Sequence, residues 1–182
     1  HVRIGTVVLL LMAAVASSLL LFSRAQFERS QLEVTQRLNL GLARYVIEHQ
    51  PRPLLTDQGQ PDAALLRDMA MDVMMTNPAL EVYLLDASGR ILGHALDGAA
   101  VRLGSVDLGP VQALLAPSAP LALPLLGDDP SAPGQLNVFS ATRLQSASGG
   151  HTGYLYIVLR GQASQGLATI AGTSGVLCDT TV

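Results

Sequence analysis

Residues 80–96 read LEVYLLDASGRILGHAL and predict two strands joined by a tight turn. The first half alternates, and a strand would place Leu80, Val82 and Leu84 on one face and Glu81, Tyr83 and Leu85 on the other. The segment 86–89 then breaks the apolar run, because Asp and Ser can bond their own backbone and Gly tolerates a positive φ. The apolar run restarts at Ile91, so the stretch predicts an antiparallel hairpin.

A helix is predicted directly before this hairpin. Asp62 is a suitable N-cap, and the segment 63–75 repeats apolar residues at helical spacing. The helix should stop at Asn77-Pro78, because proline restricts the residue before it. This helix contains several methionines, whose thioethers could bind Cu(I). Their helical spacing is better explained if they are flexible side chains that fill the core. They are Met69, Met71, Met74 and Met75.

Residues 4–22, IGTVVLLLMAAVASSLLLF, are almost wholly apolar and long enough to span a bilayer. Arg3 and Arg24 bracket the stretch. A cleaved signal peptide and a buried core helix are the alternatives. The apolar core is long for a signal peptide, and no small-x-small cleavage site follows it. We therefore expect residues 1–24 to be a transmembrane anchor, and we expect the true N-terminus to lie before His1.

Residues 25–50 predict a long membrane-proximal helix that continues the anchor. The segment carries an apolar stripe at three- and four-residue spacing, and Pro51 and Pro53 should end it. The stripe consists of Val34, Leu38, Leu42, Tyr45 and Val46. Such a helix suits a dimer seam, packing against the chain's own sheet, or both.

After the hairpin, the pattern predicts a short helix over 110–115, opened by Pro110, and an edge strand over 121–126. The loop 127–134, GDDPSAPG, is expected to be solvated. Two further strands are predicted over 135–144 and 152–160. In the second, Leu155, Ile157 and Leu159 should face one side, with Tyr154, Tyr156 and Val158 facing the other. Residues 162–182 predict a C-terminal return segment, and we expect the chain to be truncated there.

Composition and motifs argue against several function classes. The chain has 182 residues, a formal net charge of −3 and 4% aromatic residues, which gives no support for nucleic-acid binding. Only 14% of residues are charged, as expected where a membrane segment is present. The sequence contains no phosphate loop, no Gly-x-Ser-x-Gly and no His-Glu-x-x-His, and its four histidines are far apart. We therefore predict no catalytic residue, no metal site and no cofactor in this chain.

The residue pattern of the hairpin resembles that of a known class of domains. An apolar strand, then Asp86-x-x-Gly89-Arg90, then Ile91-Leu92, directly after a helix, resembles the first hairpin of PAS-like and PDC-like sensor domains. These domains lie outside the membrane in bacterial sensor histidine kinases and chemoreceptors. The resemblance covers the middle and later part of the chain, with 51–161 as the sensor domain. It implies an α+β fold, in which helices flank a PAS-like antiparallel sheet of about five strands.

The same resemblance implies a function. The chain would be the periplasmic signal-sensing part of an inner-membrane two-component histidine kinase. It would act as a homodimer, with a second span and the cytoplasmic kinase outside this fragment. Binding would shift the sheet relative to the long helix, which would carry the change through the membrane.

Candidate ligand residues follow from position within this plan. PAS-like sheets hold small molecules, often organic acids, between the sheet and its flanking loops. An anion would use an Arg fork completed by Tyr or His. Arg102 is the first candidate, followed by His94, Tyr83, Arg143 and Tyr154. For each of them an ordinary surface or edge position is the competing interpretation, and some such domains bind no ligand.

Two other function classes are compatible with the sequence. A membrane-anchored structural or interaction subunit, pilin-like or part of a secretion system, also begins with an apolar helix that becomes amphipathic. Pilin-like chains usually carry an early Glu in that stretch, and residues 4–22 contain none. A membrane-tethered enzyme is the third class, and the missing motifs disfavour it.

Overall fold

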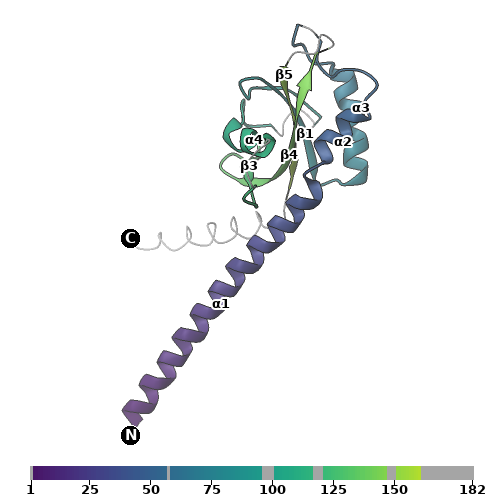
Figure 1. Cartoon of the computed structure of the whole chain (residues 1–182). Coiled ribbons are helices and arrows are strands. Elements are labelled where there is room, and N and C mark those ends of the chain that lie inside the picture. Colours follow the sequence, from purple (N-terminus) through teal and green to yellow (C-terminus); the bar gives the residue numbers. More distant parts are fainter. Residues whose placement is uncertain (1, 57, 96–100, 117–120, 147–150, 161–182) are drawn as a thin grey trace, which may run out of the picture.

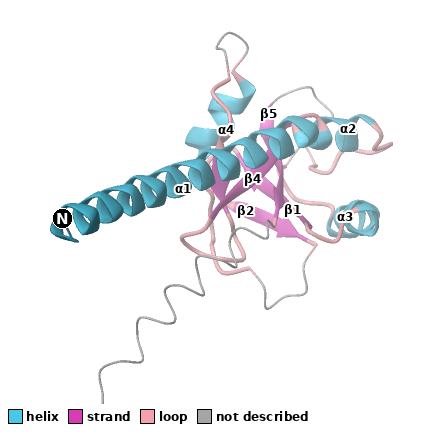
Figure 2. Cartoon of the chain, turned by 90° about the horizontal axis from the view of Figure 1, so that it is seen from below, coloured by secondary structure: helices cyan, strands magenta, loops and turns pink. Residues whose placement is uncertain are grey.

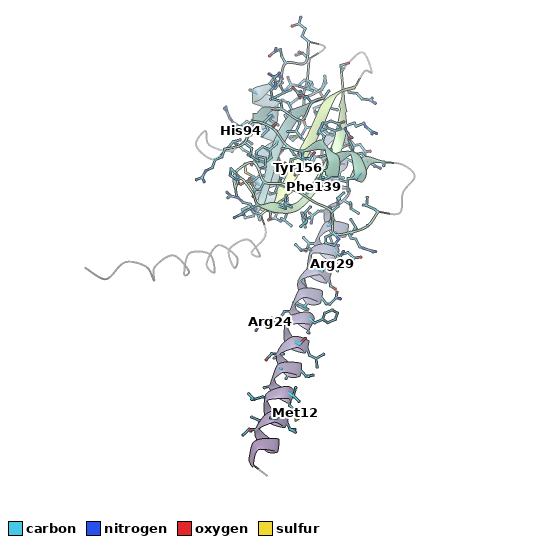
Figure 3. The ribbon with its side chains drawn as sticks, turned by 90° about the vertical axis from the view of Figure 1, so that its left-hand side faces the viewer. Met12, Arg24, Arg29, His94, Phe139 and Tyr156 are labelled. Carbon is cyan, nitrogen blue, oxygen red and sulfur yellow. The ribbon has the colours of Figure 1, made fainter. Side chains whose placement is uncertain are left out.

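The computed structural model describes residues 2–56, 58–95, 101–116, 121–146 and 151–160. Helix α1 (Val2–Asn39) is long and straight, and its C-terminal end contacts the sheet (Figure 1). Its large apolar side chains from Val7 to Phe22 are exposed. Arg24 and Arg29 lie nearer the sheet than Met12 does (Figure 3). Among the described residues, this is the one helix long and apolar enough to cross a membrane.

A break divides the helix that was predicted to run to residue 50. α1 ends at Asn39, and α2 (Leu42–Glu48) follows after Leu40 and Gly41. The first turn of α2 has no side-chain cap of its own. Ser140 supplies one from the sheet: its Oγ accepts from Ala43 N and donates to Leu40 O, both at 3.1 Å. The helical segment still ends before Pro51, as predicted.

The sheet has five antiparallel strands in the order β2-β1-β5-β4-β3. Their bounds are β1 Leu80–Asp86, β2 Ile91–His94, β3 Leu126–Asp128, β4 Leu136–Gln145 and β5 His151–Leu159. β1 pairs along its length with β5, so the first strand of the predicted hairpin lies beside the last strand, and β2 forms the edge. The predicted α+β class, with a long helix before a five-stranded antiparallel sheet, is confirmed, and the curled sheet is compatible with a PAS-like fold.

The turn between β1 and β2 forms as its residue types predict. Asp86 Oδ1 accepts hydrogen bonds from Ser88 N, Ser88 Oγ and Arg90 N, while Gly89 adopts a φ of +89°. Partial burial opposes ionisation of Asp86, but these bonds outweigh it and lower its pKa to about 2. The carboxylate is therefore ionised wherever the turn is formed at ordinary pH.

Helices cover both faces of the sheet (Figures 1 and 2). α2 and α3 (Ala63–Thr76) pack on one face, and Asp62 caps α3 by accepting from Leu65 N at 3.0 Å, as predicted. α4 (Leu108–Leu115) packs on the other face. The predicted alternation in β5 is confirmed, with Leu155 and Ile157 in the first core and Tyr154, Tyr156 and Val158 in the second.

Two element boundaries differ from the predictions. α4 starts at Leu108, with Asp107 as N-cap, so Pro110 sits within the first turn rather than opening it. That position is still compatible with proline, because first-turn N–H groups have no partner within the helix. The edge strand is shorter and later than 121–126 and covers Leu126–Asp128. The predicted C-terminal segment 162–182 lies outside the described residues.

Candidate functional site

The strand register brings four of the five predicted ligand residues to one face of the sheet. His94 is the cross-strand partner of Tyr83, and Arg143 is the partner of Tyr154. Directly paired residues point to the same side of a sheet. Tyr83 and Tyr154 are buried on the side that α4 covers, so all four residues belong to that face. The two pairs differ in exposure: both tyrosines are buried, His94 is half-buried and Arg143 is exposed.

The centre of this face is filled by the protein's own aromatic side chains. Tyr156 lies between Tyr83 and Phe139, with ring centroids 6.5 and 5.2 Å away. Figure 3 shows Tyr156 and Phe139 together over the sheet, with His94 away from them. Gly127 contributes to this packing, because a Cβ there would run into the Tyr156 hydroxyl. A small molecule at the centre of this face would have to displace these side chains.

Two of the buried tyrosines, Tyr83 and Tyr156, have raised pKa values and are neutral at ordinary pH. Burial raises the pKa of Tyr83, and the hydrogen bond to Glu81 raises it further. Burial likewise raises the pKa of Tyr156, with the charges of Asp128 and Asp129 adding to the effect. The Tyr156 hydroxyl donates to Asp128 O at 2.8 Å. These groups therefore act as hydrogen-bond donors within the core.

An open pocket of about 400 Å³ lies at the edge of the sheet, between β2 and the segment 101–104. The segment is held alongside β2 by the bond from Ile91 N to Gly104 O at 2.9 Å and by the bridge between Arg90 and Ser105. The lining residues are Ile91, Leu92, Gly93, His94, Val101, Leu103 and Gly104. This pocket is the candidate ligand site, because it is open to solvent and an imidazole lines it.

The pocket involves the predicted residues unequally. His94 lines it, whereas Tyr83, Tyr154 and Arg143 do not. Arg102 lies between the lining residues Val101 and Leu103, but its own side chain is exposed and does not line the pocket. Its backbone N donates to Pro130 O at 2.8 Å, so the main chain of this residue is fixed. The structure therefore places Arg102 beside the pocket and separates it from Arg143.

A buried polar cluster on the same face was not predicted. Tyr83 Oη donates to Glu81 Oε2 at 2.5 Å, and Arg160 Nε lies 2.6 Å from Glu81 Oε1. Arg160 Nη2 also donates to Ser131 Oγ at 3.2 Å. The signal in the sequence was a Glu at an inward-facing position of an otherwise apolar strand. Such a charge needs a partner when buried.

The expectation that residues 127–134 form a solvated loop is wrong for its central part. Asp129 is 2% exposed and accepts four hydrogen bonds. The donors are Ser131 N, Ser131 Oγ, Ala132 N and Asn137 Nδ2. Within the described part of the chain, no group of three or more His, Cys, Asp or Glu side chains is arranged to hold a metal ion. Asp129 thus organises the loop.

Comparison with protein-family models, curated proteins and solved structures gives no match for this chain. Fold and site geometry therefore supply the grounds for a functional proposal.

Proposed function

We propose that this chain is the signal-sensing domain of a membrane-bound two-component histidine kinase. The domain would lie in the periplasm, anchored in the inner membrane by α1, and would signal to a cytoplasmic kinase that is not part of this chain. The observation that supports this most is the continuity of α1. One helix extends from an exposed apolar section, sufficient to cross a bilayer, to direct contact with a PAS-like sheet.

The contact between α1 and the sheet is specific. Gln36 is fully buried and bonds both the N–H and the C=O of Leu125, each at 2.6 Å. Leu126 follows in β3 and pairs with Val138, which pairs in turn with Leu159. The entering helix and the end of the last strand therefore lie at the same end of the sheet. That arrangement suits a domain whose two chain ends both return to the membrane.

An apolar stripe on α1 supports a homodimer as part of this proposal. Phe27, Val34 and Leu38 are exposed, at spacings of seven and four residues. Such spacing places them near one face of a helix. Leu38 is 81% exposed in the single chain and is the most exposed of these three side chains, so it has the most apolar surface to bury against a partner helix. Glu33 and Arg37, paired at 2.7 Å, supply charge beside the stripe.

The pocket beside β2 is the proposed ligand site, and a small organic anion is the proposed ligand. His94 lines the pocket, and Arg102 lies between the lining residues Val101 and Leu103, so an imidazole in the lining and a guanidinium on an adjoining residue are the candidate anion contacts. The first test is a thermal-shift screen of the full chain in lipid nanodiscs against small carboxylates, amino acids and divalent cations. A ligand present at a hundred times its Kd would stabilise the domain by about 2.7 kcal/mol.

The variant Gly104→Leu tests the site. A Cβ at Gly104 meets no atom within 4 Å, so a larger side chain is tolerated there, and because Gly104 lines the pocket we expect leucine to narrow it. Gly41→Leu is the matched control, because Gly41 is equally open and lies outside the pocket lining. We expect the ligand-induced shift to be lost only in Gly104→Leu. If the ligand-induced shift is retained in Gly104→Leu, the ligand binds elsewhere. If no compound produces a shift, the proposal of a ligand-gated sensor is contradicted.

One observation favours a second candidate function, a membrane-anchored structural or interaction subunit without a ligand. The aromatic side chains that fill the α4-side face leave its centre closed. The two functions differ in output. A fusion of the chain, through its membrane helix α1, to a cytoplasmic kinase domain should show stimulus-dependent autophosphorylation if the chain is a sensor. Constant phosphorylation under every stimulus that stabilises the domain would favour the structural role.

A further inference from the structure

The segment 125–132, named the clasp here, contacts three separate parts of the molecule. Its first residue is bound to the entering helix, through the two hydrogen bonds between Leu125 and Gln36. These bonds connect residues 89 positions apart in the sequence. Because Gln36 is fully buried, water does not substitute readily for them.

The other end of the clasp is bound to the last strand. Ser131 Oγ accepts from Arg160 Nη2 at 3.2 Å, and Asp128 O accepts from the Tyr156 hydroxyl at 2.8 Å. Arg160 is itself fixed, since its backbone N donates to Ala79 O at 2.8 Å and its Nε lies beside the carboxylate of Glu81. A displacement of the clasp therefore acts on Arg160, the residue that directly follows β5.

The middle of the clasp is bound to the flank of the pocket. Pro130 O accepts from Arg102 N at 2.8 Å and from Leu103 N at 3.1 Å. Asp128 Oδ2 accepts from Asp107 N at 2.8 Å. Leu103 lines the pocket, so occupation of the pocket that moves this segment would also move Pro130.

The clasp is internally stiff. The buried Asp129 carboxylate bonds Ser131 and Ala132 within the clasp and Asn137 in β4. Satisfied buried networks of this kind resist local deformation. Residues 129–132 are therefore bonded to one another and to β4, so this part of the clasp does not readily absorb a displacement at Pro130.

We propose that the clasp couples the pocket flank 101–103 to the entering helix through Gln36 and to the last strand through Arg160. The role rests on the proposed sensor function for its biological purpose. The coupling itself is a property of the apo chain and needs neither a ligand nor a kinase. The coupling proposal can therefore be wrong even if the ligand screen finds a ligand. It can also be right if the screen finds none.

Hydrogen–deuterium exchange of the full chain in nanodiscs tests the coupling. Gln36→Ala removes the bonds at the helix end of the clasp. Peptides covering 101–107 and 128–132 should then exchange roughly two- to tenfold faster. This range corresponds to the loss of about one net hydrogen bond from the free energy that opposes local opening. Asn39→Ala is the matched control, because the Asn39 side chain bonds Thr35 O within α1 and should leave those peptides unchanged.

Faster exchange confined to α1 and residues 124–126, or equal effects of Gln36→Ala and Asn39→Ala, would overturn the proposal. Ser131→Ala approaches the same question from the opposite end and serves if Gln36→Ala does not fold. It should speed exchange at Leu125 and in the part of α1 around Gln36. An effect of Ser131→Ala limited to residues 129–137 and 158–160 would overturn the proposal as well.

Discussion

The carboxylate of Glu81 is buried in β1, and Arg160 Nε, just past the end of β5, lies 2.6 Å from it. The Arg160 side chain is half exposed, while that of Glu81 is 2% exposed. β1 and β5 are cross-strand partners along their length. When β1 pairs with β5, Arg160 is therefore brought to the buried carboxylate of Glu81 and compensates its charge.

Removing the positive partner should destabilise the domain. Arg160→Gln leaves Glu81 buried without its countercharge, and we expect a loss of about 2 kcal/mol, below the 3–5 of fully buried pairs because Arg160 is half exposed. Urea unfolding followed by tyrosine fluorescence measures the loss. Arg90→Gln is the control, because its exposed pair with Asp86 should contribute no more than about 1 kcal/mol. If the double variant Glu81→Gln/Arg160→Gln is no more stable than Arg160→Gln, the uncompensated charge is not the cause.

The break between α1 and α2 should depend on Ser140. Ser140→Ala leaves Leu40 O and Ala43 N without their sheet partner at a buried position, at a cost of about 1–3 kcal/mol. Ser105→Ala, at an exposed position, should change stability by less than about 0.5 kcal/mol. Thermal unfolding of the chain in nanodiscs compares the two. Equal stability of the variants would show that Ser140 does not hold the break.

Gly153 should tolerate no side chain. A Cβ there would run into Leu85 O of the neighbouring strand, so Gly153→Ala should force β1 and β5 apart and cost roughly 3 kcal/mol. Gly104→Ala is the control, because its Cβ would meet nothing within 4 Å. Circular dichroism of the two variants measures the loss of strand structure. A Gly153→Ala variant with wild-type stability would contradict this packing.

Alkaline pH should destabilise the domain through its buried tyrosines. The pKa of Tyr156 is raised from its ordinary 10.0, so above about pH 10 the unfolded chain releases a proton that the folded chain retains. Stability is then fully present below pH 10 and falls as the pH rises, by up to about 1.4 kcal/mol per pH unit for each such tyrosine. Denaturant titrations across this range should show a shallower fall for Tyr156→Phe. Tyr45→Phe, at a side chain that is 60% exposed, is the control for removal of a tyrosine hydroxyl outside the core.

Local features of the fold were predictable because neighbouring residues decide them. The Asp86–Gly89 turn and the Asp62 cap each depend on contacts within a few residues. The alternation of Leu155 and Ile157 against Tyr154, Tyr156 and Val158 follows from the two-residue period of a strand. An exposed apolar helix at the N-terminus follows from composition alone.

The candidate site was only partly predictable. Of the predicted ligand residues, His94 lines the candidate pocket and Arg102 lies between two lining residues; their role in binding stays a prediction. Tyr83 and Tyr154 were expected beside a ligand, but they are buried core residues. Whether an inward tyrosine lines a cavity or fills it depends on the volume of its neighbours, here Phe139 and Tyr156, and no local pattern contains that information.

The sequence by itself determined the apolar helix, the order of the elements and the alternation of faces in the strands, because these depend on composition and short-range periodicity. Only the tertiary structure decided where α1 breaks, that Asp129 is buried, and that Arg160 compensates Glu81. The partners are 100 residues apart for Ser140 and Leu40, and 89 apart for Gln36 and Leu125. Hydrogen bonding and desolvation at such positions depend on which distant segments the fold brings together, so local sequence does not specify them.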